Sequence, residues 1–92
     1  MENTRQRTQI TEQQIDAEFE EVKRAMKFRL EQKGYGTFAS IHEISGVITE
    51  EYDEMKDAVR ENDPPQVRKE LVDIAVGAIF GATCIANRTI DW

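Results

Sequence analysis

The sequence predicts an all-α protein of three helices, and three observations lead to this fold class. Apolar residues recur every three or four positions over long stretches, which is the period of a helix packed on one face. Two breaks, Gly34-Tyr35-Gly36 and Asn62-Asp63-Pro64-Pro65, divide these stretches into three. The apolar runs also lack the alternation and the turn residues of strands. We therefore expect three consecutive helices in a single domain over residues 10–92, preceded by a flexible polar tail at residues 1–9.

The first helix is expected to begin after Thr11, because Thr11 and Gln14 have the residue types and the spacing of a capping box. The helix should end at Lys33, since the glycines that follow interrupt it. Its apolar face is formed by five residues at helical spacing, namely Ile15, Phe19, Val22, Met26 and Leu30.

Ser40 and Glu43 form a second capping-box pattern, so the next helix should begin near Ile41 and continue to about Glu61. Asp63 or a neighbouring residue then caps the last helix, in whose first turn proline is tolerated. That helix should continue to about Asn87.

The last helix is apolar on nearly every side between Ile74 and Ala86, which is typical of a helix that is buried all round. Two other helices in a chain of 92 residues cannot surround it. We therefore expect a homo-oligomer in which three-helix protomers build a four-helix-bundle-type architecture. The pattern leaves a dimer and a tetramer both open.

Composition and charge argue against several classes of function. The chain carries 18 acidic and 12 basic residues, a net charge of −6, whereas proteins that bind nucleic-acid polymers present a basic surface. Cys84 is the single cysteine, so neither a disulfide framework nor a zinc cluster is expected. The most apolar stretch, Ile74 to Ala86, is too short to span a bilayer. We expect a cytoplasmic protein with no membrane partner.

Two acidic pairs, Glu51-x-x-Glu54 and Glu70-x-x-Asp73, lie on the second and third expected helices. A spacing of three residues keeps each pair on one helical face, so antiparallel packing would bring four carboxylates together. Four carboxylates stay ionised in a partly dry place only when a cation neutralises them. Because Mg²⁺ and Mn²⁺ prefer such oxygen ligands, the pattern predicts a site for one of these metals, and with it an enzyme.

Glu51 is the most informative of these acids, because it falls in the middle of an apolar arc made by Ile44, Val47, Ile48, Met55 and Ala58. Two other interpretations stay open. The acids can be surface residues of an acid-rich chain, or Glu70 can pair with one of the arginines Arg24, Arg60 or Arg68. Gly77 and Gly81 share the helical face of Glu70 and Asp73, where they leave room either for a close-packed helix or for a ligand.

The spacing of the acids resembles the motif of the all-α nucleoside triphosphate pyrophosphohydrolases, the MazG-like superfamily. This chain presents it as Glu50-Glu51-x-x-Glu54 followed by Glu70-x-x-Asp73. The run FASIHEISGVITEEYDE, from Phe38 to Glu54, is similar to the segment before the acids in short phage and bacterial members. RKELVDIAVGA, from Arg68 to Ala78, resembles their second acidic helix, and the likeness covers roughly Lys33 to Ile85.

The resemblance implies an activity and a role for each acid. The family cleaves nucleoside triphosphates between the α and β phosphates, giving a monophosphate and pyrophosphate. Nucleoside triphosphates, deoxynucleoside triphosphates in particular, are the expected substrates here, and the preferred base and sugar stay open. Mg²⁺, or Mn²⁺ in its place, would be held by Glu51, Glu54, Glu70 and Asp73. Glu50 would support the site and accept the proton of the attacking water.

Contacts to the nucleotide are expected from residues outside the acid pairs. Tyr35 occupies the place of an aromatic that stacks on the base in relatives, although it can equally be a loop aromatic that closes the core. His42 is the single histidine, and relatives of the short type carry a histidine there; its other interpretation is an exposed or capping side chain. The candidates for phosphate contacts are Lys33 and Arg88, together with Lys27 and Arg60.

One departure from the family concerns the end of the chain. Longer members follow the second acidic helix with another helix of polar and basic contacts, whereas this sequence stops at Ile90-Asp91-Trp92. Either a symmetry mate then completes the site, or part of the binding surface is missing. The alternative to an enzyme is a non-catalytic helical module for oligomerisation or interaction, whose acids keep it in solution.

Overall fold

The computed structural model describes residues 6–90, and over this range it contains three α-helices and no strand. The helices are α1 (Glu12–Lys33), α2 (Ile41–Arg60) and α3 (Pro64–Ala86), which confirms the predicted all-α class and the order of the elements. Of the expected tail, residues 1–5 lie outside the described residues, and residues 6–11 form neither helix nor strand. Residues 91–92 also lie outside the described range.

Each helix begins at the residue that the sequence predicts as its cap. The Thr11 hydroxyl accepts a hydrogen bond from the Gln14 amide, and the Gln14 side chain accepts one from the Thr11 amide, which completes a capping box. Ser40 caps α2 through the Glu43 amide, but the Glu43 carboxylate accepts from the Ala39 amide instead. The expected second capping box is therefore only half formed. Asp63 caps α3 by accepting from the Gln66 amide.

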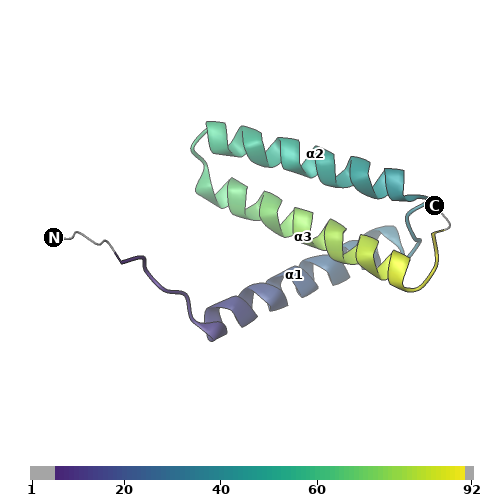
Figure 1. The fold of residues 1–92 in the computed structure, drawn as a ribbon, viewed down its shortest axis with the longest axis horizontal. Helices are drawn as coiled ribbons and strands as arrows, with labels where there is room; N and C mark the ends of the chain where they lie inside the picture. Colours follow the sequence, from purple (N-terminus) through teal and green to yellow (C-terminus); the bar gives the residue numbers. More distant parts are fainter. Residues whose placement is uncertain (1–5, 91–92) are drawn as a thin grey trace.

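α2 and α3 form an antiparallel hairpin, and they lie side by side along most of their length (Figure 1). Asn62 closes the hairpin with a φ of 56°, a left-handed conformation that asparagine tolerates better than most residues. Two glycines of α3 allow close approach of the helices. A Cβ built on Gly81 would lie 3.0 Å from Ile44 Cγ2, and one built on Gly77 would lie 3.2 Å from Ile48 Cδ1. Side chains of α2 thus pack directly against both glycines.

α1 packs against α3 and makes no backbone approach to α2 (Figure 1). The loop after α1 returns to α3 through Phe38, whose ring meets the Phe80 ring edge-on at 5.4 Å between centroids. The first half of α1 diverges from the hairpin, and residues 12–20 are all exposed. No residue of α1 is buried.

The hydrophobic core of the protomer is thin. Among the described residues, the buried apolar ones are Ala58, Val76 and Cys84, and no large side chain is fully buried. Large apolar side chains remain exposed on all three helices, including Phe19, Val59 and Leu71. The radius of gyration is 16.5 Å, whereas a compact domain of this length has about 12 Å. The protomer is therefore less compact than a typical single domain of this length. None of its described helices combines the length and the apolar character needed to cross a membrane.

Candidate functional site

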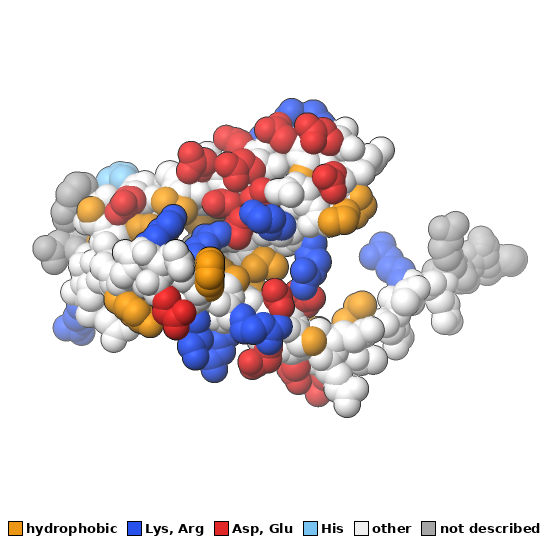
Figure 2. Space-filling model, turned by 180° about the vertical axis from the view of Figure 1, so that it is seen from behind, with side chains coloured by type: hydrophobic (Ala, Val, Ile, Leu, Met, Phe, Trp, Pro, Cys, Tyr) orange, Lys and Arg blue, Asp and Glu red, His pale blue; other side chains and the backbone are white. Residues whose placement is uncertain are grey.

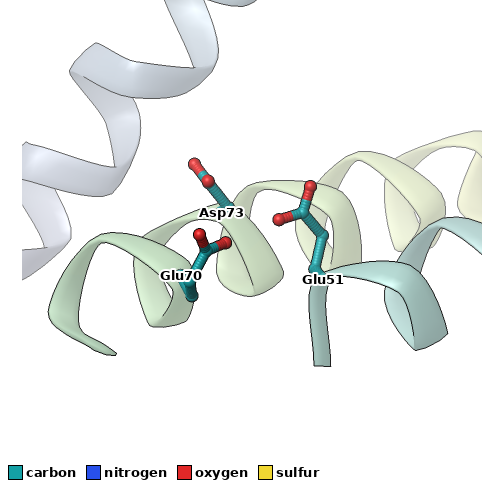
Figure 3. A group of neighbouring side chains, drawn as sticks. All are labelled: Glu51, Glu70 and Asp73. Atoms are coloured by element: carbon teal, nitrogen blue, oxygen red, sulfur yellow. The ribbon is translucent and has the colours of Figure 1, made fainter. Parts of the chain in front are cut away.

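Three carboxylates meet across the α2–α3 hairpin. Glu51 comes from α2, and Glu70 and Asp73 come from neighbouring turns of α3 (Figure 3). One carboxylate oxygen from each residue lies within 4.8 Å of one from each of the others. Three of the four ligands predicted from the acidic pairs are thus brought together, as the antiparallel packing of the two helices requires.

The cluster is unusually dry for three acids. Glu70 is 5 % exposed and Asp73 is 9 % exposed, while Glu51 is half-buried. Glu51 Oε2 and Glu70 Oε1 are buried, and neither has a hydrogen-bond partner among the described residues. A buried carboxylate oxygen without a donor is costly, so these two atoms call for a proton or a cation.

The pKa of Glu51 also indicates that its ionised form is disfavoured in the metal-free cluster. Its pKa rises to about 7, first because burial removes water from the carboxylate, and next because a protonated Glu51 could donate a hydrogen bond to the Glu70 carboxylate. The negative charges of Asp73, Glu54 and Glu70 raise this pKa further. Near neutral pH, the metal-free cluster therefore takes up a proton more readily than separate carboxylates do.

The other oxygen of Glu70 and both oxygens of Asp73 have partners. The Gln66 side-chain amide donates to Glu70 Oε2 at 2.7 Å, one helical turn before it on α3. Asp73 accepts from the Arg29 guanidinium through Oδ1 and from the Lys69 ammonium through Oδ2, the latter at 3.3 Å. Arg29 belongs to α1, so this ion pair connects α1 to α3.

The expected ion-pair alternative for Glu70 is wrong. The three arginines considered for it pair with other acids: Arg24 with Glu21, Arg60 with Asp57, and Arg68 with Glu18. The arginine that does reach the cluster is Arg29, which was not predicted from the sequence; Lys69 reaches it from α3. Its position carried a signal, because Arg29 lies seven residues after Val22 and three after Met26, on the apolar side of α1.

The two other predicted acids lie beside the cluster. Glu54 is exposed and is not one of the three converging carboxylates. Its pKa is raised, first by desolvation and then by the negative charges of Glu70 and Glu50. Glu50 is also exposed, one residue before Glu51 on α2. Both acids extend the negative field of the cluster toward solvent, and acidic side chains gather over the α2 side of the molecule (Figure 2).

A cavity of about 330 Å³ adjoins the site on the side of α1. Its wall includes two cations, an aromatic pair and two residues of α3: Arg29, Lys33, Phe38, Phe80, Val76 and Gly77. Arg29 belongs both to this wall and to the cluster, because it donates to Asp73. The cavity therefore combines apolar residues with the positive charge of Arg29 at the edge that faces the acids.

The predicted substrate residues are distributed unevenly around this cavity. Lys33 lines it, whereas Tyr35 is 68 % exposed and lies outside the lining, where Phe38 takes part. His42 is exposed in the first turn of α2, nine residues before Glu51 or about 14 Å along the helix. Arg88 follows the end of α3, about 27 Å along the helix axis from Glu70. Within one protomer, Arg88 thus lies far from the acids.

Comparison with protein-family models, with curated proteins and with solved structures gave no match to this chain.

Proposed function

We propose that this protein is a Mg²⁺-dependent hydrolase that converts nucleoside triphosphates, deoxynucleoside triphosphates in particular, into monophosphates and pyrophosphate. The observation that carries the proposal is the buried carboxylate of Glu70, one oxygen of which has no partner among the described residues and lies against Glu51 and Asp73. An acidic residue in this position destabilises the metal-free fold, which argues for a role in binding a cation.

The donor set fits a hard divalent cation. It offers carboxylate oxygens from two helices, at separations that a single ion could bridge. Glu51 Oε2 and Glu70 Oε1 are unused by protein donors in the described residues, so ligation would satisfy both. Nitrogen and sulfur ligands are absent from the cluster, which favours Mg²⁺ or Mn²⁺ over zinc.

The substrate class is supported by charge and by the spacing of the acids. Bound Mg²⁺ would neutralise the phosphates and lower the pKa of a water molecule. Arg29 and Lys33 add positive charge on the adjoining cavity, whose apolar wall suits a nucleoside better than a second phosphate. The Glu50-Glu51-x-x-Glu54 and Glu70-x-x-Asp73 motif resembles that of enzymes with this activity.

The acidic residues would have different roles in the proposed hydrolysis. Glu51, Glu70 and Asp73 would hold the cation, with Glu54 completing the set from the solvent side. Glu50, which is exposed at the rim, would accept the proton when water attacks and the bond between the α and β phosphates breaks. The leaving pyrophosphate would carry the charge that the cation stabilises.

We also propose that the active form is a homodimer or a homotetramer. Large apolar side chains such as Phe19, Val59 and Leu71 are about half exposed or more, and no large side chain between residues 6 and 90 is completely buried. Pairing these surfaces between copies would supply the core that the protomer lacks. A partner protomer could also bring its Arg88 or Tyr35 to the site, which one chain does not do.

The second candidate function is a non-catalytic helical interaction module. The exposed apolar surface of α1 and α3 favours it, because this surface suits a helical partner. The two functions differ at Glu51. A module should tolerate Glu51→Leu or gain stability from it, whereas an enzyme should lose turnover.

The direct test is a panel of nucleoside and deoxynucleoside triphosphates incubated with Mg²⁺ and assayed for pyrophosphate. Release of pyrophosphate from at least one of them supports the proposal. Absence of release from every substrate in Mg²⁺ and in Mn²⁺ would leave the interaction module as the better account.

A further inference from the structure

We propose that Arg29 and a divalent cation compete for Asp73, so that Arg29 acts as an internal counter-ion that lowers the affinity of the acid cluster for metal. This inference rests on the metal site proposed above, and it assigns a positioning role to a residue outside the acidic motif.

The three acids differ in how the protein satisfies them. Glu51 and Glu70 each keep a buried oxygen without a partner among the described residues. Asp73 keeps none, because the Arg29 guanidinium engages Oδ1 and the Lys69 ammonium engages Oδ2. Asp73 is thus the one acid of the cluster that must share or give up a protein cation in order to bind metal.

Arg29 is the stronger of the two competitors. Lys69 extends from the same helix as Asp73, its side chain is 65 % exposed, and its ammonium lies 3.3 Å from the carboxylate. Arg29 reaches Asp73 from α1, its side chain is 36 % exposed, and its planar guanidinium donates directly to the carboxylate. Charge-assisted bonds from arginine are strong and directional, and they weaken less with exposure to salt when the pair is partly buried.

The surroundings of Arg29 let its guanidinium leave Asp73. Arg29 lines the 330 Å³ cavity on one side and, on the other, an open groove that includes Glu21 and Lys69. A displaced guanidinium would therefore remain hydrated. This distinguishes the pair from a fully buried ion pair, where loss of one partner leaves a charge stranded.

The competition has a consequence for the position of α1. Two ion pairs tie α1 to α3 in the described part of the chain, Arg29–Asp73 near the middle of α3 and Arg68–Glu18 near its start. Metal bound to Asp73 would weaken the Arg29–Asp73 ion pair and leave the Arg68–Glu18 ion pair intact. Metal affinity and the attachment of α1 are thus coupled through one carboxylate, and the coupling is reciprocal.

The test is a calorimetric Mn²⁺ titration, without nucleotide, of the wild type, Arg29→Gln and Arg68→Gln. The control, Arg68→Gln, also removes an arginine ion pair between α1 and α3 but touches none of the three acids. We expect the Mn²⁺ dissociation constant of Arg29→Gln to fall about tenfold, since a unit positive charge beside the ligand is removed. That of Arg68→Gln should match the wild type.

Circular dichroism checks that each variant is folded, and Arg29→Lys, which keeps the charge without the planar fork, should bind with intermediate affinity. If the wild type binds Mn²⁺ and a folded Arg29→Gln binds it equally or more weakly, the proposed competition is overturned, but the metal site is not. Absence of binding by all the proteins overturns the metal site, and the competition with it. Binding by Arg29→Gln but not by the wild type supports both.

Discussion

Glu51 of α2 and Glu70 of α3 face each other across the helical hairpin, and each has one buried carboxylate oxygen that no donor in the described residues satisfies (Figure 3). Two carboxylates in this relationship are not both ionised without cost, so the pair takes up either a proton or a cation. Replacing one acid, changing the pH and adding a metal should therefore have linked effects on stability and activity.

Glu70→Gln should stabilise the metal-free protein and abolish its response to metal. The substitution removes the repulsion from Glu51 and Asp73, and the side chain can still accept the bond from Gln66. We expect the Tm to rise by several degrees at pH 8, where about 1 kcal/mol corresponds to roughly 4–8 °C in a domain of this size. Differential scanning fluorimetry measures both effects.

The Tm of the wild type should be higher in millimolar Mg²⁺ or Mn²⁺. Its free energy of unfolding should increase by about 2.7 kcal/mol when the metal concentration exceeds the dissociation constant a hundredfold. Asp53→Asn, which removes an exposed acid of α2, serves as the control and should respond like the wild type. If Glu70→Gln gains as much from the metal as the control does, the acid cluster is not the binding site.

Stability of the metal-free protein should fall as the pH rises from about 4.5 to about 7. The pKa of Glu51 is about 7 in the folded state, whereas the ordinary pKa of this side chain is 4.5, so the folded state binds more protons across this interval. The stabilisation is complete below 4.5 and is lost as the pH passes through about 7. Urea unfolding at pH 5 and pH 8 should show this loss in the wild type, and a smaller one in Glu51→Gln.

Metal should reverse this trend, because protons and cations compete for the same oxygens. In saturating Mg²⁺, the wild type should gain more stability from metal at pH 8 than at pH 6. An equal gain at both values would contradict the assignment of Glu51 as a ligand.

The protein should be at least a dimer at micromolar concentration, because the protomer leaves Leu71 half exposed and Phe19 63 % exposed. Light scattering coupled to size exclusion measures the mass. Leu71→Asp should shift it toward the monomer, whereas Thr49→Asp, at an exposed polar position of α2, should not. A stable wild-type monomer would be incompatible with the proposed assembly.

Lys33→Gln should raise the KM for a nucleoside triphosphate about tenfold, or ~1.4 kcal/mol, with a smaller effect on kcat. Lys33 lines the cavity but lies at the end of α1, away from the reacting centre formed by the acids. Lys27 is exposed and does not line the cavity, so Lys27→Gln is the matched control in steady-state kinetics. Equal effects of the two substitutions would exclude a specific phosphate contact for Lys33.

Local signals in the sequence were sufficient to predict the helices. Thr11, Ser40 and Asp63 cap them as expected, because a capping interaction depends on residues only three positions apart. The convergence of Glu51, Glu70 and Asp73 was also predictable, since it follows from helical period and antiparallel packing.

Relationships between distant segments were harder to predict. Arg29 and Asp73 are 44 residues apart, and their contact depends on the angle at which α1 crosses α3, which no local pattern specifies. For the same reason, the sequence favoured Tyr35 as the aromatic that contacts the base, whereas Phe38 is the aromatic of this loop on the cavity wall. The room left by Gly77 and Gly81 admitted two explanations: α2 packs against both glycines through Ile48 and Ile44, and Gly77 also lines the cavity.

The measurement that tests the central claim most directly is product analysis with Glu51→Gln beside the wild type and Asp53→Asn. With a deoxynucleoside triphosphate and Mg²⁺, the wild type and Asp53→Asn should yield monophosphate and pyrophosphate in equal amounts, without diphosphate. Glu51→Gln should stay folded and lose at least about a hundredfold in kcat, since it removes a ligand of the cation that stabilises the departing charge. Diphosphate and orthophosphate as the products, or full activity in Glu51→Gln, would contradict the account.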